Sequence, residues 1–170
     1  MQPDHSRSVA RLALKLGRWW GLSDPELNRL VQGAALHDLG KEDLPPGLLA
    51  KPGPLNEQEV ALMRTHPARG AARLLRRGAD PEVARVVLCH HESVDGRGYP
   101  AGRDRSDIPM LARMTSLADA FDALVAERAY KPSLSVREAL GVIRAERGRR
   151  FDRRLADLLL SRAPLLFTNS

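Results

Sequence analysis

The sequence predicts an all-α protein, a compact bundle of seven to nine helices. Apolar residues recur at three- and four-residue steps through most of the chain, which is the period of an amphipathic helix. No segment shows sustained alternation of apolar and polar residues or a strand-like run of β-branched residues. Glycine and proline concentrate in two stretches, residues 41–54 and 92–107, and we expect these to form loops at one end of the bundle.

The first two helices are bounded by residues that favour helix ends and starts. An apolar face runs along residues 9–19 and stops at Gly21, a residue type that commonly follows a helix end. Ser23 or Asp24 can cap the second helix, because a short side chain with an oxygen accepts a backbone N–H of the first turn. The second helix then leads to His37.

Three shorter helices are expected next. One helical turn over residues 47–50 interrupts the first loop. Asn56 caps a helix over residues 57–64, and Gly78 ends a helix over residues 67–77.

Four helices are expected in the second half of the chain. Residues 81–91 and 109–127 form two of them, on either side of the second loop. Ser135 starts the next, which ends near residue 148, and Asp152 caps the last, which reaches residue 162.

The composition argues against a secreted or membrane-spanning protein. The formal net charge of +6 comes from 23 arginines against only four lysines; it suits a phosphate-bearing ligand but equally suits arginines on solvated helix faces. No apolar run approaches the roughly 18 residues that span a bilayer, and the first residues lack the features of a secretory signal. The one cysteine, Cys89, fits a reducing compartment. We therefore expect a cytoplasmic protein without membrane insertion.

Histidine and aspartate are paired in a way that suggests a metal site. A lone histidine on an apolar helix is more often a core residue than a ligand, but His37 is followed by Asp38, and His90 by His91, each pair near a predicted helix end. Asp119 lies in mid-helix, where burial of an unpaired carboxylate is costly. Gathered together, such side chains bind divalent ions, and two ions about 3.5–4 Å apart activate a water for attack on a phosphodiester. Spacing alone leaves open whether the helices converge.

Two motifs resemble those of a known family. The segment A-A-L-H-D-L-G-K at residues 34–41 resembles the signature of the HD phosphohydrolase superfamily, and H-H-E-S-V-D-G-R-G-Y-P at residues 90–100 resembles the second signature of its HD-GYP subgroup. The similarity extends from His5 to about Phe151. It implies an HD-domain-like fold and one catalytic domain over residues 1–170, without the family's N-terminal sensor domain. Further segments that follow the family's pattern lie at residues 48–55, 63–70, 108–113, 117–124 and 127–132.

The resemblance implies a centre of two divalent metal ions, with Fe or Mn preferred and Zn, Ni or Mg as alternatives. Some family members support a third ion with a glutamate one turn before the first histidine, where this chain has Met1. Asp38 is implied as the carboxylate that bridges the two ions. The implied metal ligands are His5, His37, Asp38, His66, His90, His91 and Asp119.

The family hydrolyses cyclic di-GMP to linear pGpG and in some members on to GMP, so the resemblance implies a cyclic dinucleotide substrate and no DNA or RNA polymer. Asp38 and Lys41 match catalytic positions, with Lys41 near the scissile phosphate. Lys41, Arg128 and Lys131 match residues that bind the substrate's phosphates. The Gly96–Pro100 loop is a candidate surface for a protein partner, and a homodimer is a further candidate assembly. Within that loop, we expect Tyr99 to pack or to contact a partner rather than to take part in chemistry.

Two other functions stay open at this point. The chain could be a signalling module that binds metal and cyclic dinucleotide with weak or no turnover, or an HD hydrolase of another nucleotide. Glu42 and Asp43 stand where the family has an apolar residue and a glycine, and two carboxylates there either weaken the binding of an anionic substrate or are simply solvated. Intact Lys41 and Arg128 and the complete G-Y-P motif favour hydrolysis of cyclic di-GMP.

Overall fold

The computed structural model describes residues 3–126 and 133–166, and in these ranges the predicted all-α fold is confirmed. The described residues form nine α-helices, of which α3 is a single turn, and no β-strand. The helices are α1 (Pro3–Trp20), α2 (Asp24–Leu36), α3 (Pro46–Leu49), α4 (Glu57–Met63), α5 (His66–Arg76), α6 (Pro81–Cys89), α7 (Met110–Val125), α8 (Val136–Ala145) and α9 (Arg153–Arg162), with short 3-10 helices η1 (Leu39–Asp43) and η2 (Ala163–Leu166).

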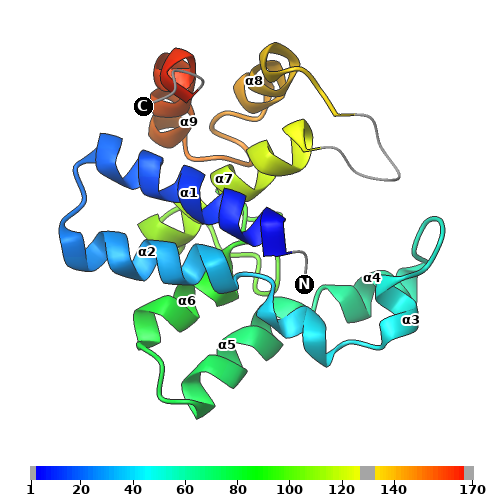
Figure 1. Ribbon diagram of the computed structural model, residues 1–170. Coiled ribbons are helices and arrows are strands. Elements are labelled where there is room, and N and C mark those ends of the chain that lie inside the picture. Colours follow the sequence, from blue (N-terminus) through cyan, green and yellow to red (C-terminus); the bar gives the residue numbers. More distant parts are fainter. Residues whose placement is uncertain (1–2, 127–132, 167–170) are drawn as a thin grey trace.

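Helix α7 is the centre of the arrangement. It contacts α1, α2 and α6 on one side and α8 and α9 on the other. In Figure 1, α1 and α2 run antiparallel, α5 and α6 lie below them and α8 and α9 above, while α3 and α4 project to the side. The site described below lies where α1, α2, α5, α6 and α7 meet.

The main core forms around α7 and fixes its rotation. The small residues of α7, among them Ala112, Ala118 and Ala120, are buried and allow the neighbouring helices to approach closely. Because α7 is enclosed, its mid-helix polar residues face protein rather than water. The largest fully buried apolar residues of this core are Leu16, Leu30, Met114, Leu117, Ile143, Leu155 and Leu159.

The helix caps expected from the sequence are present. The Glu59 backbone N–H donates to Asn56 Oδ1 at 2.9 Å, and the Asn56 backbone N–H donates to the Glu59 carboxylate at 2.8 Å. Ser135 makes the same reciprocal exchange with Glu138, and Asp152 accepts from the Arg154 backbone N–H at 2.9 Å. Each cap satisfies N–H groups that have no partner inside the helix, which is why these starts are readable from sequence.

The structure differs from the prediction at the end of one helix and in one additional short helix. The helix expected over residues 81–91 ends at Cys89, so that His90 and His91 lie in the turn that follows. Helix η1 was not predicted, and its residues 41–43 were expected to belong to the first loop. Among the described residues, no helix is long and apolar enough to cross a membrane.

Candidate metal centre

Three histidines at helix ends share one geometry. His37 is the C-cap of α2, His66 is the first residue of α5, and His90 is the C-cap of α6. In each, ring Nδ1 lies 2.7–2.8 Å from the backbone carbonyl oxygen three residues earlier. Because a carbonyl only accepts, Nδ1 carries a proton, and in the neutral ring the lone pair is then on Nε2. The carbonyls that accept these bonds are those of Ala34, Met63 and Val87.

A first group of four side chains surrounds Asp38. Its Oδ1 lies 3.4 Å from His66 Nε2, which in turn lies 3.4 Å from His90 Nε2. The His91 ring stacks beside the His90 ring with centroids 4.0 Å apart. One potential ligand atom from each of the four lies within 4.8 Å of all the others, close enough to share an ion.

A second group of three side chains adjoins the first. His5 Nε2 lies 3.1 Å from Asp119 Oδ1, and His37 Nε2 lies 3.7 Å from the same oxygen. His37 Nε2 is also 3.6 Å from Asp38 Oδ2, so the two groups meet at these neighbouring residues. The structure thus brings all seven sequence-predicted ligand positions into one place. We call these side chains the His/Asp cluster: His5, His37, Asp38, His66, His90, His91 and Asp119.

Asp122 is a member of the surroundings that sequence reasoning missed. His5 Nδ1 donates to Asp122 Oδ2 at 2.6 Å, and both side chains are largely buried. The only sequence signal is that Asp122 follows Asp119 by three residues, which places both on one face of α7. Its partner is 117 residues away, so spacing could not identify the contact.

Burial and charge set the protonation of the cluster in opposite directions. Burial lowers the pKa of His90 to about 3, and it lowers those of His91 and His66 as well. Hydrogen bonds to Asp119 and then Asp122 instead raise the pKa of His5 to about 9. Neutral imidazoles are the form that binds metal, so His5 must lose a proton first.

The two carboxylates of the cluster stay ionised. Burial alone would raise the pKa of Asp119, but the hydrogen bond from His5 and the nearby imidazole rings outweigh burial and lower it. Nearby His37 and Lys41 likewise outweigh burial at Asp38 and lower its pKa. Ionised carboxylates and neutral imidazoles together form a donor set suited to Fe, Mn or Zn.

One buried atom tests whether this donor set fits a metal. His37 Nε2 is buried and has no hydrogen-bond partner among the described residues. Its nearest carboxylate oxygens, on Asp38 and Asp119, lie 3.6 and 3.7 Å away, beyond hydrogen-bond distance. An unsatisfied buried polar group costs about 1–3 kcal/mol. A divalent ion between the imidazole and these carboxylates would satisfy the His37 nitrogen. The residues of the cluster therefore fit a divalent metal ion.

Helix η1 places Lys41 at the edge of the cluster. Its ammonium donates to Asp38 Oδ2 at 2.7 Å and is about one-third exposed. The backbone turn needs glycine at position 40, because a Cβ there would lie 2.0 Å from the carbonyl oxygen of His66. This contact holds η1 against the start of α5.

Glu42 and Asp43, which depart from the family pattern, turn away from the cluster. Arg73 of α5 donates to the Glu42 carboxylate at 2.9 Å and lies 3.5 Å from Asp43 Oδ1. Their charge is therefore partly compensated by α5. Arg128 and Lys131, the predicted phosphate-binding residues, lie outside the described residues.

The loop that follows α6 folds back onto His91. The Tyr99 N–H donates to the His91 carbonyl at 3.1 Å, and the two rings pack with centroids 4.7 Å apart. Gly98 allows this return, because a Cβ there would lie 2.3 Å from the Ser93 nitrogen. Glu92 is buried and accepts from backbone N–H groups at 2.8 and 2.9 Å, which closes the loop. The G-Y-P residues thus support the position of a predicted ligand.

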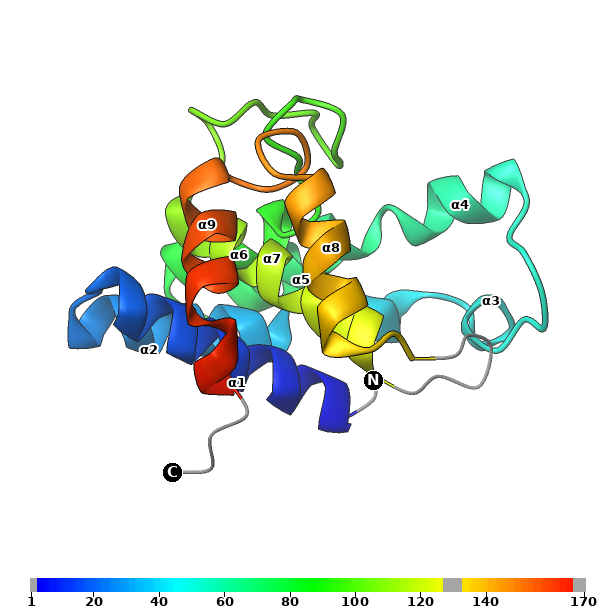
Figure 2. The same ribbon diagram turned by 90° about the horizontal axis from the view of Figure 1, so that it is seen from above.

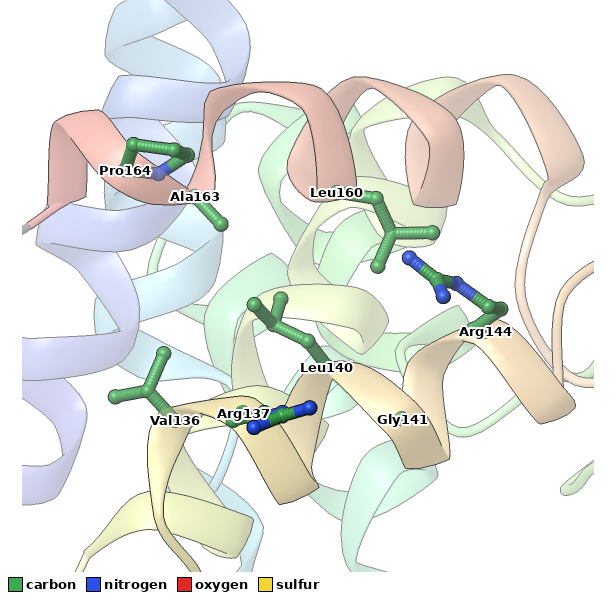
Figure 3. A pocket seen from close by; sticks show the side chains of 8 residues that line it. All are labelled: Val136, Arg137, Leu140, Gly141, Arg144, Leu160, Ala163 and Pro164. Carbon is green, nitrogen blue, oxygen red and sulfur yellow. The ribbon is translucent and has the colours of Figure 1, made fainter.

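One cavity of the structure lies away from the cluster. It has a volume of about 670 Å³ and opens between α8 and α9. In Figure 3, Leu140 and Leu160 point toward each other across it, and the Arg144 side chain enters from α8. No member of the His/Asp cluster lines this cavity.

Comparison with known proteins identifies the class to which this fold and cluster belong. The family model described as HD domain matches residues 3–155, and the chain therefore belongs to the HD domain family. The structure of Bd1817, an HDG"Y"P protein from Bdellovibrio bacteriovorus, superposes with a TM-score of 0.77 at 25% identity, covering 95% of this chain and 52% of that one. The predicted resemblance to HD-GYP phosphodiesterases is confirmed.

Two curated relatives are named for cyclic dinucleotides. The chain is 42% identical over 143 residues to the cyclic di-GMP phosphodiesterase response regulator RpfG of Xanthomonas campestris, covering 82% of this chain and 38% of RpfG. It is 37% identical over 158 residues to 3′3′-cGAMP-specific phosphodiesterase 2 of Vibrio cholerae, covering 92% of this chain and 30% of that protein. The chain thus spans 38% of one relative's length and 30% of the other's.

Proposed function

We propose that this chain is a metal-dependent phosphodiesterase domain that hydrolyses cyclic di-GMP to linear pGpG. The observation that carries the proposal is the His/Asp cluster, in which four side chains around Asp38 adjoin three around Asp119. Two adjacent ligand groups suit two divalent ions, and Fe or Mn fit this mixture of imidazole and carboxylate. When bound, such ions activate a water and neutralise charge on a phosphodiester.

We infer that Asp38 holds both ions. Its Oδ1 faces His66 of the first ligand group, and its Oδ2 faces His37 of the second, at 3.4 and 3.6 Å. A carboxylate whose two oxygens face different ligand groups can bridge two ions and fix the distance between them. We therefore assign Asp38 as both metal ligand and catalytic residue.

We infer that Lys41 acts on the phosphate. Its ammonium lies 2.7 Å from Asp38 Oδ2 and is partly exposed, at the border between the buried cluster and solvent. From this position it would stabilise negative charge on the phosphate or give a proton to the leaving 3′ oxygen. Arg128 and Lys131 complete the proposal as phosphate-binding residues on the basis of the sequence motif alone.

A second candidate substrate has its own supporting observation. The relative that is 37% identical is named as specific for 3′3′-cGAMP. The two cyclic dinucleotides differ only in one purine base, whereas the cluster acts on the phosphodiester that both share. The chemistry proposed for the cluster is therefore the same for either substrate.

The experiment compares both substrates on one sample. Protein loaded with Mn or Fe under reducing conditions is incubated with cyclic di-GMP and with 3′3′-cGAMP, and linear products are separated while bound metal is measured. Faster loss of cyclic di-GMP, to pGpG alone or on to GMP, supports the proposal. Preference for 3′3′-cGAMP supports the second candidate, and binding without cleavage of either would show a non-catalytic signalling module.

Other expectations remain predictions. These are the cytoplasmic location, a homodimer, and a protein partner at the Gly96–Pro100 loop. In that loop Arg97 and Pro100 are exposed, whereas Tyr99 packs on His91. A partner would therefore contact Arg97 and Pro100 before it reached the tyrosine ring.

A further inference from the structure

A cavity of about 350 Å³ lies directly beside the His/Asp cluster. His91, a member of the cluster, forms part of its wall, and so does the Tyr99 ring that packs on His91. The opposite parts of the wall come from distant segments, with Arg64 between α4 and α5, and Arg149 and Arg150 in the connection between α8 and α9. We call this space the arginine cavity.

Specific contacts bring these segments together. Ser93 Oγ donates to the Arg149 carbonyl at 3.3 Å, and the Val94 N–H donates to the Arg150 carbonyl at 3.4 Å. Figure 2 shows the green loop that follows α6 lying beside the orange connection between α8 and α9. Arg149 and Arg150 therefore border the cavity because their own backbone is bonded to the loop that follows α6.

The guanidinium groups of this wall are available to a ligand. Arg64, Arg149 and Arg150 are exposed, and none forms an ion pair with any residue that the structure describes. Arg64 lies over the Tyr99 ring, with Cζ 5.4 Å from the ring centroid, and Arg150 lies over a phenylalanine ring. Stacking of this kind orients a guanidinium while leaving its N–H donors at the edge unoccupied.

The acidic residues of the wall compensate this charge only in part. Glu92 is bonded to two backbone N–H groups of its own loop, and Asp95 accepts from Ser93 Oγ at 2.6 Å and lies 3.9 Å from Arg97 Nε. Glu146 is the third carboxylate on the wall. Two of the three carboxylates are thus already engaged by the loop, whereas three arginines have no acidic partner in the described ranges.

We propose that the arginine cavity binds the phosphate of the cyclic dinucleotide that is not being cleaved. This inference rests on the proposed function. The two phosphates of such a substrate belong to one small macrocycle, so when one occupies the His/Asp cluster the other must lie in an adjoining space. The arginine cavity adjoins the cluster through His91 and presents planar forks that match a phosphate in a bidentate manner.

A phosphate fits this cavity better than a purine base does. A base bound at this position would need an aromatic face on which to stack. The Tyr99 ring is already packed by His91 at 4.7 Å and covered by the Arg64 guanidinium. What the wall leaves open is therefore hydrogen-bond donors with positive charge, which is the chemistry of an oxyanion site.

The test compares two phosphodiesters in Arg64→Gln and Arg149→Gln. Bis(p-nitrophenyl) phosphate has a single phosphate and reports on the metal centre alone, whereas cyclic di-GMP has two. Each variant should raise the KM for cyclic di-GMP about 10- to 100-fold, as expected for loss of a charge-assisted hydrogen bond, and leave hydrolysis of the small diester unchanged. Arg64→Lys should recover part of the affinity. Arg76→Gln, an exposed arginine at the far end of α5, is the matched control.

Binding of pGpG and cyclic di-GMP, measured by calorimetry on the same proteins, separates this inference from the proposed function. If the parent binds cyclic di-GMP without cleaving it and the two variants bind it at least tenfold more weakly, the cavity assignment stands and the catalytic proposal falls. If the variants bind and cleave cyclic di-GMP as the parent does, the cavity assignment is wrong. Equal losses on both diesters would overturn it too, because they would place the arginines in the metal centre.

Discussion

His5 and Asp122 are joined by a 2.6 Å hydrogen bond from Nδ1 of the imidazole to Oδ2 of the carboxylate. The other ring nitrogen of His5 lies 3.1 Å from Asp119 Oδ1. With a carboxylate at each nitrogen, the imidazole is held as a cation in the metal-free protein, which is why its pKa is raised to about 9. A metal ion bound between Nε2 and Asp119 would take the place of that proton, while Asp122 would keep the ring in position.

From this relationship we expect Asp122 to control metal affinity without touching metal. In Asp122→Ala, His5 loses the partner that orients its ring, so affinity for the second ion should fall about 10- to 100-fold, the usual effect of removing the hydrogen-bond partner of a metal-binding histidine. In Asp122→Asn, the amide oxygen still accepts from Nδ1, so the loss should be smaller. Bound Mn or Fe measured after dialysis against graded chelator distinguishes the variants. Asp107→Asn, an exposed loop carboxylate, is the control, and equal metal content in all four proteins would remove Asp122 from this role.

The stability of metal-free protein should fall as the pH drops below about 6.5. Burial holds the pKa of His90 at about 3, against an ordinary value of 6.5. The unfolded chain therefore binds a proton in this window that the folded chain does not, so folding is favoured above it and weakened within it. His66 and His91 are lowered in the same direction, and each such group contributes at most about 1.4 kcal/mol per pH unit.

The raised pKa of His5 changes folding stability with pH in the opposite direction. Its raised pKa stabilises the folded state below 6.5, and this contribution is lost as the pH rises through about 9. Urea unfolding of chelator-treated protein at several pH values should therefore show greatest stability near neutrality. Metal-loaded protein should retain its stability further into acid than the metal-free form. A flat profile between about pH 5 and pH 7 in the metal-free protein would contradict the assigned burial of the histidines.

Gly40→Ala should disrupt both the fold and the site. A Cβ at position 40 would lie 2.0 Å from the His66 carbonyl oxygen and 2.5 Å from the Gly70 nitrogen, and neither backbone atom can move alone. Separation of η1 from α5 should cost at least about 1–3 kcal/mol of unfolding free energy and reduce metal content, since η1 directly follows Asp38 and α5 carries His66. Gly47→Ala, where a Cβ meets nothing within 4 Å, is the matched control. Equal denaturation midpoints for the two variants would show that η1 adapts.

The helices were predictable where their signals are local. Asn56, Ser135 and Asp152 cap helices through bonds to residues two or three positions away, so a short window of sequence contains the whole interaction. Helix η1 was not predicted because it depends on the contact of Gly40 with α5, which a window of that length does not include.

The residues of the candidate site also fall into those that the sequence predicted and those that it did not. All seven cluster positions were named from sequence, because motif resemblance carries long-range information that periodicity does not. Asp122 was missed because its role is defined by His5, 117 residues away. The arginine cavity was missed for a similar reason, since Arg64 and Arg149 border one cavity only in the folded chain, where the loop after α6 is bonded to the connection between α8 and α9.

Lys41 is the residue at which catalysis and metal binding should separate. Its ammonium bonds to Asp38 but occupies none of the ligand positions of the cluster, so Lys41→Ala should retain two ions per chain. Loss of a group that stabilises charge or donates a proton should lower turnover of cyclic di-GMP about 10²- to 10³-fold. Asp38→Ala, in contrast, should lose metal and turnover together, because it removes the carboxylate that faces both ligand groups. Steady-state kinetics with metal analysis on the same samples makes the comparison, with Lys15→Ala on α1 as the control lysine. If Lys41→Ala turns over as fast as the parent, Lys41 only neutralises Asp38; if it loses metal, its bond to Asp38 is part of the metal centre's support.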